Sequence, residues 1–282
     1  MNTRTHSIRG LGWRHRDLPS HIFVGLVVLV TFFPLYFMLI TSVKSTSQMR
    51  HYFLVPVTPV YWNNYVVAFR QLMRYFLNTA IVAGVSVPGI ILLSAFTAFV
   101  FARFAFPGKA VLFYAIISLL MVPSVLTLVP AFVWIKNLGL LNTYWALIFP
   151  YMAGGQVFGI YLLRGYFATI PNELFDSAKV DGANIFQVFA RIALPLAKPM
   201  LSVIGIVNLL STWNDYIWPL VTLQENSMRT LTIGLRYFQG QFQTNYGPLF
   251  AGYVLGSLPL FILFMVAMRP FMSGLTAGAV KM

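Results

Sequence analysis

The sequence lacks cysteine altogether and has few charged residues, of which only six are acidic. Without cysteine, the chain has no disulfide framework, no thiolate metal site and no cysteine nucleophile. Charged residues of both signs make up 9% of the 282 residues, and hydrophobic residues make up 59%. A soluble domain needs about a quarter of its residues charged to cover its surface. The composition therefore excludes an ordinary soluble enzyme and indicates a membrane protein.

The formal charge of +13 raises the question of nucleic-acid binding. The 19 lysines and arginines are scattered between apolar runs, whereas a phosphate backbone requires a clustered basic stripe. We therefore expect no nucleic-acid partner and interpret the basic residues as determinants of membrane topology.

Six apolar runs are long enough to cross a bilayer, which takes roughly 20 residues. They are Ile22–Val43, Phe76–Phe101, Val111–Ile135, Tyr144–Leu163, Met200–Leu223 and Leu249–Met268. The first run exceeds the 7 to 15 residues typical of a signal peptide core, and no small-residue cleavage site follows it, so we expect a retained helix. The sequence thus predicts an all-α polytopic membrane protein whose six-helix membrane domain spans residues 22–268.

Lysine and arginine are distributed unevenly between the two sides of these runs. With the N-terminus inside, twelve of the 19 fall on the inner side and seven on the outer side. Because basic residues favour cytoplasmic loops, we expect residues 1–21 to be a cytoplasmic N-terminal segment and residues 269–282 a cytoplasmic tail. The alternative is the opposite orientation, which would put Arg103–Lys109 and Arg164–Pro199 outside.

Proline and glycine interrupt the second, third and fourth predicted crossings. The positions are Pro88-Gly89, Pro123, Pro130, Pro150 and Gly154-Gly155. Such residues either only kink a helix or free backbone groups that line a wet cavity. The sequence leaves both interpretations open.

A polar stripe marks the fifth predicted crossing. Asn208, Ser211, Thr212 and Asp215 have the i, i+3, i+4 and i+7 spacing that places them on one face of a helix. Asp215 is the only carboxylate in the six runs, and a charge at that depth needs a partner or water. We interpret this face as part of a translocation path; the alternative is hydrogen bonding that holds helices together.

The segment between Arg164 and Pro199 leaves the membrane, because it holds half of the six acids. Thr169-Ile-Pro171 is suited to start a helix, and Gly182 to end it. Asn184 and Gln187 have capping-box spacing for a second short helix, which we expect Pro195 and Pro199 to stop. Two ordered helices around a glycine turn form a rigid elbow that suits docking to a partner better than a solvated connector does.

The elbow also resembles a known signature. The segment Ile170–Ala183 (IPNELFDSAKVDGA), followed by Ile192-Ala-Leu-Pro195, resembles the EAA motif of binding-protein-dependent ABC importer permeases. Asp176, Ser177 and Ala178 match its EAA triplet, with Asp for Glu and Ser for Ala, and Gly182 matches its glycine. Trp213–Pro219 (WNDYIWP) and Gly274–Lys281 (GLTAGAVK) resemble motifs of the second permease subunit in maltose-type carbohydrate importers, although Met282 stands where relatives usually end in Gly.

This resemblance implies a prokaryotic cell-membrane protein that pairs with a homologous second permease, two ATP-binding subunits and an external solute-binding protein. The cargo would be a sugar or oligosaccharide, or a sugar alcohol or glycerol-phosphate compound as in some relatives. The elbow 164–199 would couple to the ATPase, the outer loop 224–248 would contact the binding protein, and the C-terminal tail 274–281 would reach the ATPase interface. The expected coupling residues are Glu173, Asp176, Ser177, Ala178, Asp181 and Gly182.

Two other classes of function are alternatives to this one. The chain has no Walker A loop, because Gly108-Lys109 is followed by Ala110 without the required earlier glycine, so ATP and magnesium would be bound by the partner ATPase and no cofactor or metal by this chain. One is an intramembrane hydrolase, but this sequence contains neither the motifs nor the catalytic pair that such an enzyme needs. A proton-coupled secondary transporter using Asp215 is the stronger rival, although the chain shows no inverted halves.

Overall fold

The computed structural model describes residues 18–240 and 244–279, except for the side chains of residues 269, 270 and 273–279. The described residues form helices joined by loops, with no β-strand among them, which confirms the predicted all-α fold. In chain order the elements are α1 (Leu18–Ser42), α2 (Thr46–His51), α3 (Asn63–Arg103), α4 (Lys109–Ser118), η2 (Leu119–Met121), α5 (Ser124–Asn137), α6 (Trp145–Ala168), α7 (Asn172–Val180), α8 (Ile185–Val188), η3 (Phe189–Ala193), α9 (Leu194–Leu196), α10 (Lys198–Asn214), α11 (Ile217–Thr222), α12 (Leu231–Gly234), η4 (Leu235–Phe238) and α13 (Tyr246–Ala279).

Four of these helices, α1, α3, α6 and α13, are each long and apolar enough to cross a membrane. Two bent helix pairs meet the same test together: Lys109–Met121 with α5, and Ile185–Leu196 with α10. The described residues therefore hold four spans, or up to six if each bent pair is one span. The count of six crossings and the cytoplasmic placement of both termini stay predictions.

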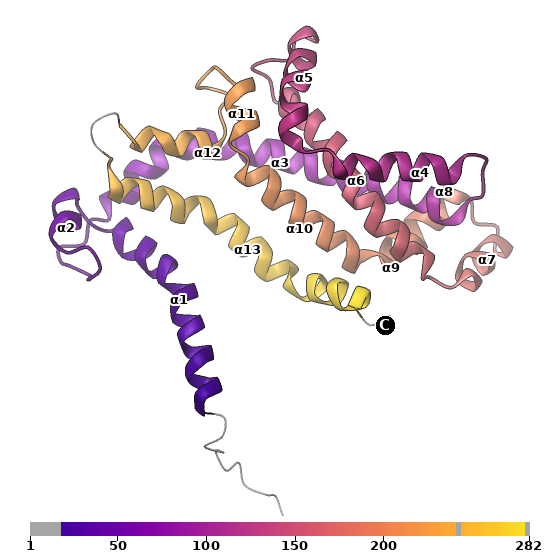
Figure 1. Ribbon diagram of the computed structural model, residues 1–282, viewed down its shortest axis with the longest axis horizontal. Coiled ribbons are helices and arrows are strands. Elements are labelled where there is room, and N and C mark those ends of the chain that lie inside the picture. Colours follow the sequence, from indigo (N-terminus) through magenta and orange to yellow (C-terminus); the bar gives the residue numbers. More distant parts are fainter. Residues whose placement is uncertain (1–17, 241–243, 280–282) are drawn as a thin grey trace, which may run out of the picture.

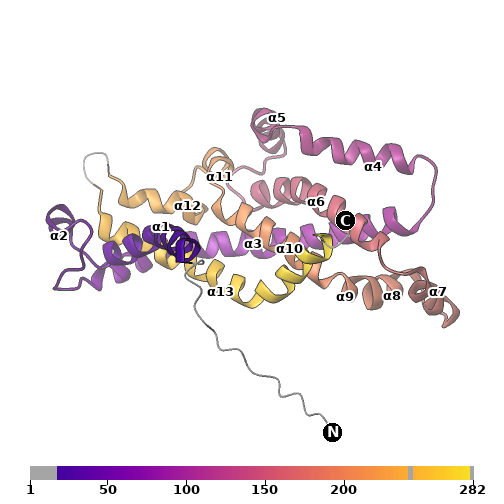
Figure 2. The same ribbon diagram turned by 60° about the horizontal axis from the view of Figure 1, so that its bottom comes forward.

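Helix α3 forms the axis of the molecule. Its 41 residues correspond to roughly 60 Å of helix, about twice the hydrocarbon thickness of a bilayer. It begins at Asn63 instead of the predicted Phe76, because the preceding amphipathic turns pack on α12 and α13. Figures 1 and 2 show α3 running between the two ends of the molecule, with α2 and α12 at one end and α7 and α8 at the other.

Helices α6 and α10 pack closely on α3 through small residues. A β-carbon on Gly159 of α6 would collide with Ser94 of α3, whose hydroxyl donates to the carbonyl of Ile90 at 2.5 Å. At the α7 end, Phe99 of α3 joins Leu163 and Phe167 of α6 and Ile204 of α10 in the largest buried apolar cluster. This close packing makes α3, α6 and α10 one rigid unit.

The predicted third crossing is not one straight helix. Lys109–Met121 and Ser124–Asn137 meet at an angle of 102°. Val122, which precedes Pro123, is extended with φ −82° and ψ 116°, because a proline ring disfavours helical backbone in the residue before it. Pro88, Pro130 and Pro150, in contrast, lie inside continuous helices. Of these four prolines, only Pro123 lies at a bend between two helices.

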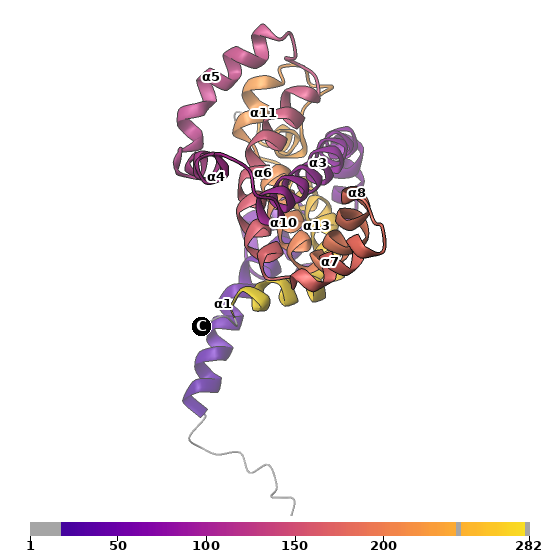
Figure 3. The same cartoon turned by 90° about the vertical axis from the view of Figure 1, so that its right-hand side faces the viewer.

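Helix α1 projects from the rest of the molecule (Figures 1 and 3). None of its most apolar window is buried within the chain. Its C-terminal half contacts α13, for example through the edge-to-face pair of Phe37 with Phe250, whose ring centroids lie 5.5 Å apart. Because exposed apolar surface is stable only in an apolar surrounding, this helix fits a membrane environment.

The last membrane helix continues into the segment predicted as a cytoplasmic tail. Helix α13 continues to Ala279, beyond the predicted end of the last crossing at Met268. Extending an existing helix costs far less than nucleating a new one, so small residues such as Ala277 and Ala279 follow the membrane helix. The predictions for residues 1–17 and 280–282 lie outside the described residues.

Candidate functional site

The elbow begins with the helix and glycine turn that the sequence predicts. Helix α7 starts directly after Pro171 and ends at a Schellman motif, in which Gly182 has φ +77°. The N–H of Gly182 donates to the carbonyl of Lys179 at 3.0 Å, and the N–H of Ala183 to that of Ala178 at 2.9 Å. These two bonds satisfy carbonyls that would otherwise be unpaired at the helix end.

The second helix of the elbow begins as predicted but ends later. Asn184 and Gln187 form a capping box, with bonds of 2.9 Å and 2.8 Å between each backbone N–H and the other side chain. The expectation that Pro195 stops the helix is wrong, because helical backbone continues to Leu196. The π-turn η3 widens the helix just before Pro195, so that Leu194 N–H bonds to Phe189 and the proline ring is accommodated.

Helix α7 has one face toward the molecule and one face toward the outside. Phe175 and Ala178 are buried in the cluster around Phe99. The other five predicted coupling residues are exposed: Glu173, Asp176, Ser177, Asp181 and Gly182. Val180 beside them is 87% exposed, and Asp176 forms a surface ion pair with Lys179 at 3.0 Å. Ala178 therefore sets how closely α7 packs against the cluster around Phe99, whereas the five exposed residues are available to a partner.

Arg103, the last residue of α3, fastens the elbow to the membrane helices. Its Nη2 donates to the carbonyls of Phe167 at 2.5 Å and Ile170 at 2.6 Å, and its Nη1 to the Asn172 side chain at 2.6 Å. Its guanidinium also lies 3.9 Å from the centre of the Phe175 ring. One cation thus binds the end of α6 and the start of α7. Sequence reasoning missed this role, because Arg103 carried no signal beyond its charge.

The predicted path residues do not share one helical face. Helix α10 ends at Asn214, and Asp215 is extended with ψ 133°. Asn208 is 8% exposed and Thr212 is buried, whereas Ser211 is exposed. The prediction of a single stripe is therefore wrong for Asp215, which lies in the break between α10 and α11. No sequence signal marked this break, since Pro219 falls inside α11.

Asn208 and Asp215 both contact neighbouring helices. Oδ1 of Asn208 lies where a side chain on Gly155 would have to be, which makes glycine necessary at that point of α6. Oδ2 of Asp215 accepts from the hydroxyl of Tyr151 at 2.8 Å, and its backbone carbonyl accepts from the hydroxyl of Thr232 at 2.6 Å. These contacts support the interpretation of interhelical hydrogen bonding for Asp215, whereas Nδ2 of Asn208 donates within its own helix, to the carbonyl of Ile204 at 2.9 Å.

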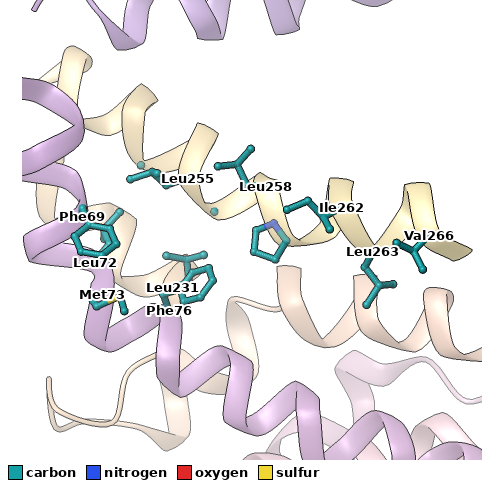
Figure 4. A pocket seen from close by; sticks show the side chains of 13 residues that line it. Phe69, Leu72, Met73, Phe76, Leu231, Leu255, Leu258, Ile262, Leu263 and Val266 are labelled. Carbon is teal, nitrogen blue, oxygen red and sulfur yellow. The ribbon is translucent and has the colours of Figure 1, made fainter. Parts of the chain in front are cut away.

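Two large cavities flank α13, and neither includes a predicted path residue. One, of about 660 Å³, is lined by apolar side chains of α3, α12 and α13, such as Phe69, Leu231 and Ile262 (Figure 4). The other, of about 750 Å³, lies between α3, α10 and α13 and is also mainly apolar. A sugar needs several polar partners for its hydroxyl groups. Neither cavity supplies them, so neither is a candidate sugar site.

In the first half of α3, on the side toward α2, side chains hold the start of the predicted outer loop 224–248. Nδ2 of Asn78 donates to the carbonyls of Ser227 and Arg229, both at 2.9 Å, and Arg74 Nε donates to Ser227 at 3.0 Å. Thr79 accepts from the N–H of Leu231 at 2.8 Å. Because the bonds go to its backbone, the loop presents the exposed side chains of residues 224–226 on a fixed base.

The segment between α1 and α3 is fixed on the same side by a buried lysine. Lys44 is 1% exposed, and its Nζ donates to the carbonyls of Tyr52 at 2.7 Å and Phe53 at 3.1 Å. Burial lowers the pKa of Lys44, since an apolar surrounding disfavours the charged ammonium. Lys44 is one of the seven basic residues on the predicted outer side, and its hydrogen bonds hold the connection around α2.

Residues 90–274 match the family described as binding-protein-dependent transport system inner membrane component. The chain belongs to this family. The predicted resemblance and the predicted inner-membrane location are thereby confirmed. The matched segment includes α6, the elbow and α10, and therefore both groups of predicted site residues.

Named relatives of this inner membrane component agree with that assignment. This chain is 34% identical over 273 residues to the probable ABC transporter permease protein YurM of Bacillus subtilis (strain 168), and the alignment covers 95% of this chain and 90% of the relative. It is 35% identical over 210 residues to the maltose/maltodextrin transport system permease protein MalG of Escherichia coli (strain K12), covering 72% and 71%. A crystal structure of a bacterial ABC transporter involved in the import of alginate shares the fold, with a TM-score of 0.82, 21% identity and coverage of 93% and 100%.

Proposed function

We propose that this chain is one of two homologous permease subunits of an ABC importer, and that the importer moves a sugar or oligosaccharide delivered by an external binding protein. Two separate ATPase subunits hydrolyse ATP and hold magnesium, since this sequence has no nucleotide-binding loop. The carbohydrate class rests on the relatives, because the names of MalG and the alginate transporter both state a saccharide cargo.

The observation that carries the proposal is that α3 holds two loops at positions far apart along its length. Arg103 binds α7 at the C-terminal end of α3, and Asn78 with Thr79 binds the outer loop in the first half of the helix. The 25 positions between Asn78 and Arg103 span roughly 38 Å of continuous helix. Coupling between an ATPase and a binding protein requires a rigid element whose conformational equilibrium is shifted by binding at both sites.

The solute path is proposed to form only between the two permeases. Ser211 and Leu210 are exposed on α10, whereas Asn208 and Thr212 face the interior of this chain. The second permease would cover the exposed side of α10 and supply the polar groups that the two apolar cavities lack. This arrangement keeps Ser211 as a path residue and gives Asn208, Thr212 and Asp215 a supporting role.

The test uses Val180, which the isolated chain leaves 87% exposed. We expect Val180→Asp to reduce co-purification of the ATPase subunits at least tenfold, because a carboxylate would have to be desolvated in the apolar part of a docking groove. Co-purification of the second permease should be unchanged. The matched control is Val55→Asp, which introduces the same change at a 60% exposed position on the outer side.

Affinity purification of the tagged chain from membranes, with quantification of each subunit, measures this effect. Equal ATPase recovery from Val180→Asp and wild type would remove α7 from the ATPase interface. Equal losses from Val180→Asp and Val55→Asp would show a general folding defect and would also count against the proposed docking.

A further inference from the structure

A basic cavity of about 530 Å³ lies beside the turn that joins α3 to α4. Its lining includes the cations Lys109 and Arg164, the rings of Phe113 and Tyr114, and Gly108, but no acidic residue. The cavity lies at the same end of the molecule as α7, where α4 begins its apolar run (Figures 1 and 2). Two cations without a counter-ion in a cavity make a site for an anion.

The donors in this cavity are largely unused. The Arg164 guanidinium lies 4.1 Å from the centre of the Phe113 ring and has no hydrogen-bond acceptor within the part of the chain that the structure describes. The ammonium of Lys109 donates once, to the carbonyl of Phe104 at 2.8 Å, which leaves two N–H groups. Arginine stacked on a ring presents its N–H fork to one side, a geometry that matches a phosphate group.

The start of α4 adds to the positive electrostatic potential in the cavity. Gly108 precedes the helix with φ +78°, and no side chain caps the helix. The positive end of the helix dipole therefore acts beside Lys109, with free backbone N–H groups in the first turn. This helix end reinforces the two side-chain cations that line the cavity.

The surface next to the cavity is apolar. Val111 is 74% exposed and Tyr114 is 70% exposed, and Figures 2 and 3 show α4 and α5 at the periphery of the molecule. The ligand that fits both surfaces has an anionic head and hydrocarbon chains. A carboxylate of a neighbouring protein would satisfy the cations but would leave the apolar face of α4 uncovered.

We propose that this cavity binds the headgroup phosphate of an anionic phospholipid, whose acyl chains lie along the exposed face of α4. Basic pockets between membrane helices recognise such headgroups by charge and by hydrogen bonds to the phosphate oxygens. The phosphate bridges Arg164 of α6 and Lys109 of α4, so the bound lipid holds α4 against α6. This role is separate from solute transport and does not depend on the carbohydrate assignment.

The experiment compares lipid binding by the complete transporter in native mass spectrometry. Delipidated complex is titrated with phosphatidylglycerol or with phosphatidylcholine of the same acyl chains. We expect wild type to prefer phosphatidylglycerol, and Arg164→Gln to lose about tenfold in affinity for it, the effect of one charge-assisted contact. The matched control is Arg191→Gln, which removes an exposed cation of the elbow that does not line the cavity.

Three results would overturn the proposal. One is equal affinity of wild type for the two lipids, and another is an unchanged lipid preference in Arg164→Gln. The third is displacement of phosphatidylglycerol by an equal concentration of inorganic phosphate, which would make the cavity a site for a free anion. Loss of the ATPase subunits from Arg164→Gln, with lipid affinity retained, would assign the cations to a protein interface instead.

Discussion

Replacing Arg103 by methionine is expected to uncouple ATP hydrolysis from solute uptake. The substitution removes three hydrogen bonds, to Phe167, Ile170 and Asn172, and the stacking on Phe175. Hydrogen bonds to charged groups contribute about 1.5–3 kcal/mol each when they are removed singly. Loss of even one such contribution changes a conformational equilibrium about tenfold, so α7 would no longer follow α3.

The measurement is the ratio of solute transported to ATP hydrolysed, in proteoliposomes that contain the complete transporter. We expect this ratio to fall about tenfold for Arg103→Met, with an intermediate value for Arg103→Lys, which keeps the charge but not the planar fork. Arg70→Met is the matched control, because Arg70 lies exposed on the same helix and away from the elbow. A wild-type ratio in Arg103→Met, with normal subunit assembly, would mean that α3 does not hold the elbow during transport.

Asp215→Ala is expected to lower the stability of the transporter more than it lowers the rate of solute uptake by the assembled complex. The carboxylate accepts from the Tyr151 hydroxyl at 2.8 Å, and its other oxygen lies 3.4 Å from the N–H of Trp218 at the start of α11. Removing it leaves the partly buried hydroxyl of Tyr151 without its acceptor, at a cost of about 1 kcal/mol or more. We expect a lower thermal midpoint for the purified complex and a lower yield of assembled transporter.

A double-mutant cycle separates this bond from other effects of the substitutions. Tyr151→Phe removes the donor, and Asp215→Asn keeps an acceptor in the same place and should be the mildest variant. If the hydrogen bond between Tyr151 and Asp215 accounts for most of the stability that each substitution removes, the double variant Tyr151→Phe with Asp215→Ala should lose little more stability than either single variant. Full thermal stability of Asp215→Ala together with abolished uptake would contradict the anchoring role and restore the interpretation of Asp215 as a path residue.

Hydropathy and cap residues were sufficient to predict much of this fold. A membrane crossing requires a long apolar run, so such runs along the sequence were sufficient to predict α1, α6 and most of α13. Helix ends that depend on local bonds were equally predictable: Gly182 has the positive φ, and Asn184 forms the capping box. Both signals act within a few residues, where the sequence contains all the partners.

The features that the sequence did not predict depend on distant partners. Pro123 breaks the chain direction whereas Pro88 does not, because Pro88 lies in a helix packed on α6 and α10. The break at Asp215 is stabilised by Tyr151 and Thr232, which are 64 and 17 positions away. Arg103 finds its acceptors 64 to 69 positions further along the chain. No periodicity or spacing within one segment carries that information.

Uptake by reconstituted proteoliposomes tests most directly whether this permease works only as part of an ATP-driven complex. Vesicles would contain this chain, its second permease and the ATPase subunits, with loaded binding protein on the outer side. We predict carbohydrate uptake that requires ATP and binding protein and that persists when an ionophore collapses the proton gradient. Uptake by this chain alone, driven by a proton gradient in the absence of ATP, would contradict the account and support a secondary transporter.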